Sequence, residues 1–215
     1  MCLIIFSVKQ HPAFPLVVAA NRDEFFRRPT AAMDWWHSET AGRDVLAGRD
    51  LQSGGTWLAV DEDGAVAAVT NVREGSQVTG AHSRGELPLM ALADNSDTLA
   101  ARLQTRKSDY SGFNLVRLSG HSGWYYSNRD AHPGRHVHRG TYGLSNHLLQ
   151  TPLMTSITIL SNACRTPRRR PTMNYRIPVL ARTPSAFCLR RSLLAVTTVP
   201  APRQWSRSAP SVKSG

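Results

Sequence analysis

The chain has 215 residues, of which 26 are Lys or Arg and 15 are Asp or Glu, so its formal net charge is +11. This length suits one domain with a sizeable core, and no stretch approaches the roughly 18 consecutive apolar residues of a membrane-spanning helix. The start lacks the marks of a signal peptide, and three cysteines without a C-x-x-C pair argue against a disulfide framework or a cysteine zinc site. We therefore expect a cytoplasmic protein.

The positive charge belongs to the last part of the chain. The first 150 residues contain 15 basic and all 15 acidic residues, whereas residues 151–215 contain 11 basic and no acidic residues, 8 prolines and a single glycine. We therefore divide the chain into a folded domain, 1–153, and a basic Pro-rich tail, 154–215. The tail could be an arm for nucleic acid or an acidic membrane, but a disordered tail without a specific nucleic-acid role is the simpler interpretation.

Taken in order, the segments of the first part predict an α+β fold. Residues 3–8 and 15–21 are short apolar runs that predict buried strands. Residues 56–72 and 113–129 each predict two strands joined by a turn. Between these hairpins, residues 83–107 form the one good helical region, in which Ser83 and Glu86 have capping-box spacing and Pro88 should bend or delay the first helix. This order favours largely antiparallel sheets.

Cys2 is the first candidate for chemistry, because removal of Met1 would make it the N-terminal residue. Its α-amine, with a pKa of about 7.7 to 8.0, could then take the thiol proton, so that one residue supplies both nucleophile and base. The alternative is a small buried hydrophobe that opens a strand.

Two asparagines could supply the amide donors that such a nucleophile needs for the oxyanion formed at a carbonyl. Asn71 and Asn146 both lie at the ends of strand-like runs, where side chains tend to project from a sheet edge. Either residue could instead cap a turn or tolerate a left-handed backbone.

Four polar residues, Asn21 to Glu24, follow the second apolar run directly. In extended conformation Asn21 and Asp23 face one way, and Arg22 and Glu24 face the other. Asp23 could orient the amine of Cys2, Arg22 could clamp a carboxylate or carbonyl, and Asn21 and Glu24 could contact the substrate. The alternative is a solvated strand end whose charges pair locally.

Two further patterns are weaker evidence for a functional site. His132, His136 and His138 could place imidazoles on one strand face, but no acidic or Cys ligand lies close in the sequence, so we expect no metal and no cofactor. The glycine pair in GRDLQSGGTW lacks the strand-to-helix context of a phosphate loop and predicts a bend before Trp57.

Eight segments in order resemble the NRDE protein family, and the match covers roughly residues 1–153. The segments are Met1-Cys2, NRDEFFRRPT, AGRDLQSGGTWLAV, TNVRE, SRGEL, FNLV, WYYSNR and YGLSNHLLQTP. The family in turn resembles N-terminal nucleophile hydrolases, which implies a four-layer αββα sandwich. For eukaryotic members, the resemblance also implies involvement in Golgi organisation and secretion and in acyl-lipid or haem handling.

Carried over by position, the resemblance implies that Cys2 is nucleophile and amine base for an amide or thioester substrate. Arg22 and Asp23 would be its polar partners, and Asn71 and Asn146 the oxyanion donors. A competing hypothesis is a non-catalytic carrier of an acyl ligand or haem that uses the same strand for recognition.

The tail departs from the family pattern, because nothing in residues 154–215 matches the family's closing segment. The absence of acidic residues and the loss of glycine motivate the hypothesis that the tail is translated out of frame. The sandwich would then be incomplete at its C-terminal end, with uncovered sheet edges.

Overall fold

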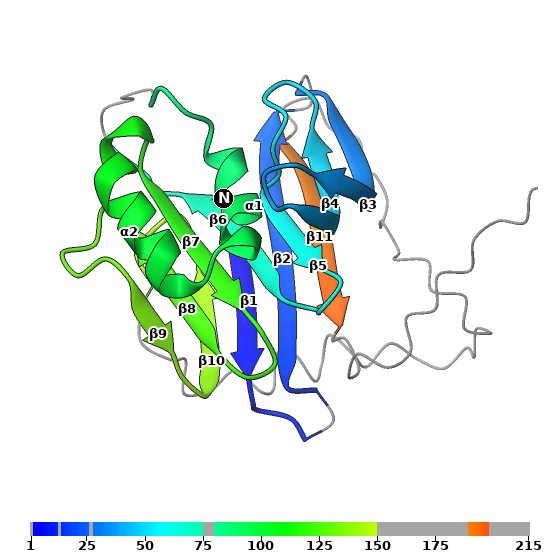
Figure 1. Ribbon diagram of the computed structural model, residues 1–215. Helices are drawn as coiled ribbons and strands as arrows, with labels where there is room; N and C mark the ends of the chain where they lie inside the picture. Colours follow the sequence, from blue (N-terminus) through cyan, green and yellow to red (C-terminus); the bar gives the residue numbers. More distant parts are fainter. Residues whose placement is uncertain (1, 13, 26–27, 75–79, 150–188, 198–215) are drawn as a thin grey trace, which may run out of the picture.

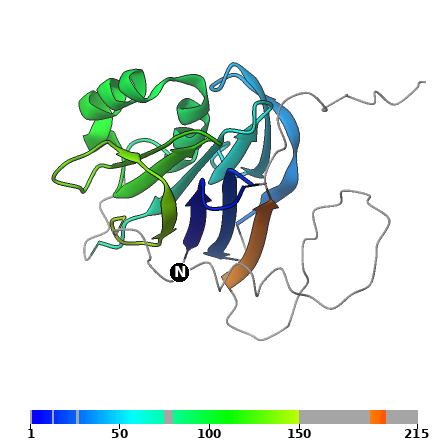
Figure 2. The same cartoon turned by 90° about the horizontal axis from the view of Figure 1, so that it is seen from below.

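The structure, a computed structural model, describes residues 2–12, 14–25, 28–74, 80–149 and 189–197. Two antiparallel sheets and a pair of helices lie in three layers, with the larger sheet between the helices and the smaller sheet (Figures 1 and 2). The prediction of an α+β fold with largely antiparallel sheets is confirmed. The four-layer sandwich stays a prediction, since a second helical layer is not among the described residues.

The smaller sheet has the strand order β10-β1-β2-β11. Its strands are β1 (Leu3–Val8), β2 (Leu16–Phe25), β10 (Gly140–Leu144) and β11 (Leu189–Thr197). Both apolar runs predicted as strands are confirmed, and β1 pairs with β2 from Leu3 opposite Asn21 to Val8 opposite Leu16. The polar stretch is not a strand exit as we expected, because β2 continues through it to Phe25.

β11 lies inside the segment predicted to be a tail. It pairs antiparallel with β2 over nine residues, with Arg191 opposite Asp23 and Thr197 opposite Val17. This pairing supplies hydrogen-bond partners to an edge of β2 that the out-of-frame hypothesis would leave uncovered. The rest of residues 154–215 lies outside the described residues.

The larger sheet runs in chain order from β3 to β9. Its strands are β3 (Thr30–Ser38), β4 (Arg43–Asp50), β5 (Leu58–Asp61), β6 (Val66–Asn71), β7 (Phe113–Leu118), β8 (Gly123–Ser127) and β9 (Arg135–Val137). Both predicted hairpins are present as β5–β6 and β7–β8. We missed β3 and β4: an irregular register between Ala31 and Asp34 and a mostly exposed β3 remove the period of two that marks a strand.

The helical region contains a 3₁₀ turn η1 (Arg84–Glu86), α1 (Leu87–Ala93), α2 (Ser96–Arg106) and a second 3₁₀ turn η2 (Lys107–Asp109). The Ser83 hydroxyl accepts from the Gly85 N–H at the start of η1, and Pro88 lies in the first turn of α1. Proline is tolerated there because its missing N–H has no helical partner in any case. The proline therefore delays the helix and does not bend it.

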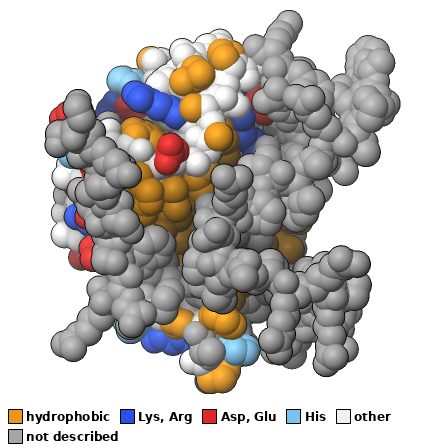
Figure 3. All heavy atoms as spheres, turned by 90° about the vertical axis from the view of Figure 1, so that its right-hand side faces the viewer, with side chains coloured by type: hydrophobic (Ala, Val, Ile, Leu, Met, Phe, Trp, Pro, Cys, Tyr) orange, Lys and Arg blue, Asp and Glu red, His pale blue; other side chains and the backbone are white. Residues whose placement is uncertain are grey.

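Two hydrophobic clusters hold the layers together. One lies between the helices and the larger sheet and includes Leu87, Leu99 and Leu115. The other fills the space between the two sheets and includes Phe6 and Val116. Figure 3 faces the side on which β3 and β11 lie, and it shows hydrophobic side chains gathered in the middle below polar and charged ones.

No helix in the described ranges is both long enough and apolar enough to cross a membrane.

Candidate functional site

The antiparallel pairing of β1 with its two neighbours assembles a site around Cys2. Leu3 lies opposite Asn21 on one side, and Ile4 lies opposite Leu144 on the other. Cys2 is thereby placed beside the polar stretch of β2 and beside the segment that follows β10. In Figure 1 this end of β1 is marked by the N label.

Asn146 holds the backbone of Cys2. The Cys2 N–H donates to Asn146 Oδ1 at 3.1 Å, and Asn146 Nδ2 donates to the Asn71 carbonyl at 2.9 Å. Because the first partner is a donor and the second an acceptor, the two contacts together fix the orientation of the amide. One proton of the Asn146 amide remains for another acceptor.

The two predicted oxyanion donors therefore lie side by side, but they are joined through the backbone of Asn71. The Asn71 side chain is exposed at the last position of β6. The Arg73 N–H donates to the Asn146 carbonyl at 2.9 Å, so the segment after β6 also holds the one after β10. The oxyanion role of both asparagines stays a prediction.

A fully buried residue, Asn114 in β7, supports the segment that carries Asn146. Its amide Nδ2 donates to Thr70 Oγ1 at 3.1 Å and to the His147 carbonyl at 3.0 Å. Its Oδ1 accepts from the Tyr125 hydroxyl at 2.9 Å, and that hydroxyl accepts from the Leu149 N–H at 3.2 Å. These bonds anchor residues 145–149 on the larger sheet.

The segment after β6 is held by a second set of contacts. The Val72 N–H donates to the Gly112 carbonyl, which also accepts from the Arg84 guanidinium at 3.1 Å. Glu74 forms an ion pair with Arg129. A Cβ at position 112 would lie 2.8 Å from the Glu74 carboxylate, so a side chain there would displace Glu74.

The thiol of Cys2 is partly buried, and burial is the main reason that its pKa lies above the ordinary value. The positive charges of the amino terminus and of Arg22 act in the opposite direction, and the Glu24 carboxylate adds to the increase. The thiol is consequently neutral at neutral pH and needs a base to become a nucleophile.

Arg22 is fixed on both sides. Its guanidinium lies 3.7 Å from the centre of the Trp57 ring and forms a 3.1 Å ion pair with Glu24. The Trp57 ring packs against Gly48 of β4, where a Cβ would lie 3.2 Å from it. Burial lowers the pKa of Arg22 and Glu24 opposes that decrease, and a guanidinium remains charged at neutral pH.

The alternation predicted for the polar stretch places Arg22 and Glu24 on the same face, as their ion pair shows. The structure describes Asp23 only through its backbone, so its role in orienting the amine stays a prediction. Asn21 lies half-buried opposite Leu3, and its contact with a substrate is likewise a prediction.

Sequence reasoning did not assign a role to Trp57, Asn114 or Arg84. All three lie within segments that carry the family resemblance, namely TWLAV, FNLV and SRGEL. Their position in these segments was the signal that could have identified them. Within the described ranges, no three His, Cys, Asp or Glu residues lie close enough to hold a metal ion.

The family model described as Transport and Golgi organisation 2 matches residues 1–165. The bovine Transport and Golgi organization protein 2 homolog is 39% identical over 166 residues, which cover 71% of this chain and 59% of the relative. The human homolog is 37% identical over the same length and the same fractions of both chains. Transport and Golgi organization protein 2 of Drosophila melanogaster is 32% identical over 132 residues, which cover 55% of this chain and 46% of the relative. The chain thus spans about three fifths of the bovine and human relatives, and it belongs to the Transport and Golgi organisation 2 family.

Proposed function

We propose that this protein is a cysteine hydrolase of the N-terminal nucleophile type, in which Cys2 attacks the carbonyl carbon of an amide or thioester after Met1 is removed. The observation that carries the proposal is the hydrogen bond from the Cys2 nitrogen to Asn146 Oδ1. In a processed chain that nitrogen would be the α-amine, held by one of its own protons, so that its lone pair would face away from Asn146.

The chemistry follows from this arrangement. The lone pair of the amine takes the thiol proton, the sulfur forms a bond to the carbonyl carbon, and the carbonyl π electrons move to oxygen. When the carbonyl re-forms, the bond to the leaving nitrogen or sulfur breaks, and the leaving group takes the proton from the ammonium. Water then attacks the acyl-cysteine, releases the carboxylic acid and restores the thiol.

The neighbouring charges suit the steps in which negative charge develops. Burial raises the pKa of the thiol most, the amino terminus and Arg22 lower it, and Glu24 raises it, so Arg22 favours the thiolate and its ion pair with Glu24 moderates that effect. The remaining proton of the Asn146 amide is a donor for an oxyanion near Cys2. Burial of the thiol strengthens each of these interactions, because fewer waters screen them.

A second candidate is a non-catalytic carrier of an acyl ligand or haem that works in Golgi organisation, the process in the names of the relatives. The raised pKa of the Cys2 thiol favours this alternative, because a neutral, partly buried thiol behaves as a small hydrophobe. The carrier does not require a free amine on Cys2.

The test is the intact mass of the purified full-length chain before and after treatment with a thioester probe that acylates N-terminal cysteine nucleophiles. The hydrolase proposal expects loss of Met1 and one adduct that maps to Cys2. This adduct should be lost in the Cys2→Ala variant. Peptide mapping separates this adduct from any on Cys164 or Cys188.

Asn146→Ala and Gln104→Ala form a matched pair for the same assay, since each removes an amide but only Asn146 contacts Cys2. The proposal expects a loss of about tenfold or more in the acylation rate for Asn146→Ala alone. A retained Met1, or acylation confined to Cys164 and Cys188, would reject the hydrolase and leave the carrier.

A further inference from the structure

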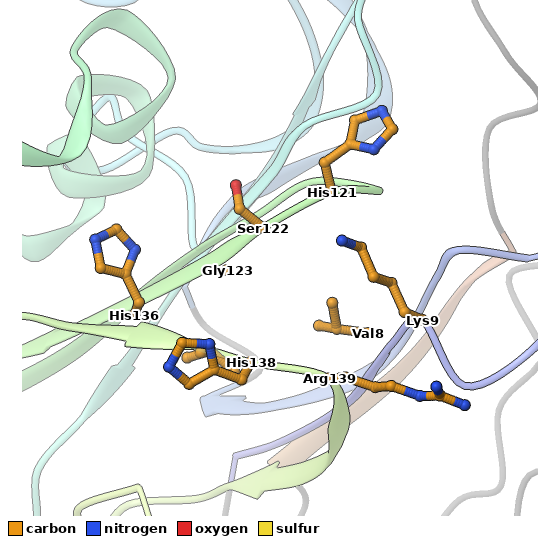
Figure 4. Close-up of a pocket in the computed structure, with 9 residues that line it drawn as sticks. Val8, Lys9, His121, Ser122, Gly123, His136, His138 and Arg139 are labelled. Atoms are coloured by element: carbon orange, nitrogen blue, oxygen red, sulfur yellow. The ribbon is translucent and has the colours of Figure 1, made fainter.

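A pocket lies at the opposite end of β1 from Cys2. It is a pocket of about 200 Å³ between the end of β1, the turn that joins β7 to β8, and the connection from β9 to β10 (Figure 4). Six residue-to-residue steps of roughly 3.3 Å lead from Cys2 to Val8, so about 20 Å of strand lies between the two sites.

The lining of this pocket is basic. Of its nine lining residues, five carry a basic side chain and none carries a carboxylate. The five basic residues are Lys9, His121, His136, His138 and Arg139. Among the described residues none of these five forms an ion pair, although the first 150 residues contain as many acidic as basic residues.

Three segments that are distant in sequence bring these groups together, and Figure 4 shows how they lie. The Lys9 ammonium extends toward the turn with His121 and Ser122, and His138 lies across from it, while the Arg139 guanidinium is directed outward from the rim. Lys9 carries a permanent charge, the imidazoles supply N–H donors, and no lining carboxylate pairs with them, so an anion is the ligand that suits these groups.

The backbone of Lys9 adds an independent observation. Its φ is 53°, and it is the one residue other than glycine with a positive φ among the described residues. A left-handed conformation is unfavourable for an L-residue with a Cβ. The conformation is held by a 2.7 Å hydrogen bond from the Lys9 N–H to the Pro15 carbonyl, so the turn fixes the direction in which the Lys9 side chain leaves the backbone.

We propose that the pocket lined by Lys9 and His138 binds a phosphomonoester or inorganic phosphate. A phosphate offers several strong acceptor oxygens and carries up to two negative charges, which match one permanent cation, imidazole N–H donors and the nearby Ser122 hydroxyl. The pocket is smaller than the roughly 300 Å³ of small-molecule sites, so it suits a headgroup rather than a whole ligand.

The test is a calorimetric titration of the full-length protein with inorganic phosphate in a chloride buffer. The basic tail of the chain can attract anions without specificity. Variants of single residues therefore distinguish phosphate binding in the pocket from binding to the tail. Lys9→Asn removes the charge, and asparagine tolerates a positive φ, so the turn keeps its shape. Lys107→Gln removes an exposed lysine in η2 that does not line the pocket.

The proposal expects saturable binding that weakens about fivefold to tenfold in Lys9→Asn and in His138→Gln, and less than twofold in Lys107→Gln. Equal losses in all three variants, or the absence of saturation, would overturn the proposal.

Sedimentation with phosphatidylcholine vesicles, with and without phosphatidic acid, identifies the source of the phosphate. Retention on phosphatidic acid that Lys9→Asn abolishes and Lys107→Gln preserves assigns a lipid headgroup. Phosphate binding without such retention assigns a free phosphomonoester. Neither experiment depends on Cys2, so its result tests the phosphate proposal independently of the proposed hydrolase activity.

Discussion

Replacement of Asn114 by alanine should destabilise the protein and loosen the segment that carries Asn146. Asn114 has no exposed surface and makes hydrogen bonds to Thr70, Tyr125 and the carbonyl of His147. Truncation would leave the buried Tyr125 hydroxyl without its acceptor and the His147 carbonyl without its side-chain donor.

The size of the effect follows from those two groups. A buried polar group that loses its partner costs about 1 to 3 kcal/mol. The Tyr125 hydroxyl is fully enclosed and lies toward the upper end of that range, whereas the carbonyl of exposed His147 can recruit water. We therefore expect the free energy of unfolding to fall by about 2 to 4 kcal/mol in Asn114→Ala.

Urea unfolding gives the global change, and hydrogen exchange of the amides in residues 145–149 gives the local one. Gln104→Ala serves as the control, because Gln104 is exposed on α2 and its loss should change stability by less than about 0.5 kcal/mol. The reasoning fails if Asn114→Ala unfolds at the urea concentration of the control, or if exchange at the Leu149 amide is unchanged.

Three further outcomes follow from contacts near the site. Arg22→Gln should slow alkylation of Cys2 by iodoacetamide about twofold to fivefold at neutral pH, because the Arg22 charge lowers the pKa of the thiol. Burial alone would raise the pKa of Asp50, but its hydrogen bonds, led by the one from Arg28, lower it. The stabilisation is therefore present above the ordinary carboxyl pKa and lost as pH falls below it, so Arg28→Gln should cost about 1 to 2 kcal/mol at pH 7 and less below about pH 4 in urea unfolding. Gly55→Ala should lower the free energy of unfolding by about 2 to 3 kcal/mol, because its Cβ would lie 2.4 Å from backbone atoms of η1.

Each of these outcomes has a matched comparison. Glu24→Gln should speed the alkylation of Cys2, since the Glu24 carboxylate raises the thiol pKa, and a change in the same direction as Arg22→Gln would contradict the electrostatic account. A stability gap for Arg28→Gln that stays constant from pH 7 to about pH 3 would contradict the linkage to Asp50. Gly120→Ala should lower the free energy of unfolding less than Gly55→Ala, because among the described residues its Cβ would meet only the Pro15 ring, at 3.3 Å.

The sequence by itself determined the strands and helices with strong local signals. Apolar runs bounded by turn residues identified β1, β2 and both hairpins, and Ser83 and Pro88 located the start of the helical region. It also determined the family, since matching segments in a fixed order needed no structure. The short-range order in β2, with Arg22 and Glu24 on one face, followed from the period of a strand.

Only the tertiary structure decided which of these pieces meet. The hydrogen bond between Cys2 and Asn146 joins residues 144 positions apart, and it depends on the order β10-β1-β2, which no local pattern specifies. The stacking of Arg22 on Trp57 joins the two sheets, and Asn114 acts from a buried strand for which the sequence predicted no role in the site. Local periodicity records which face of an element is buried, whereas the partner that covers that face is chosen by packing of the whole chain.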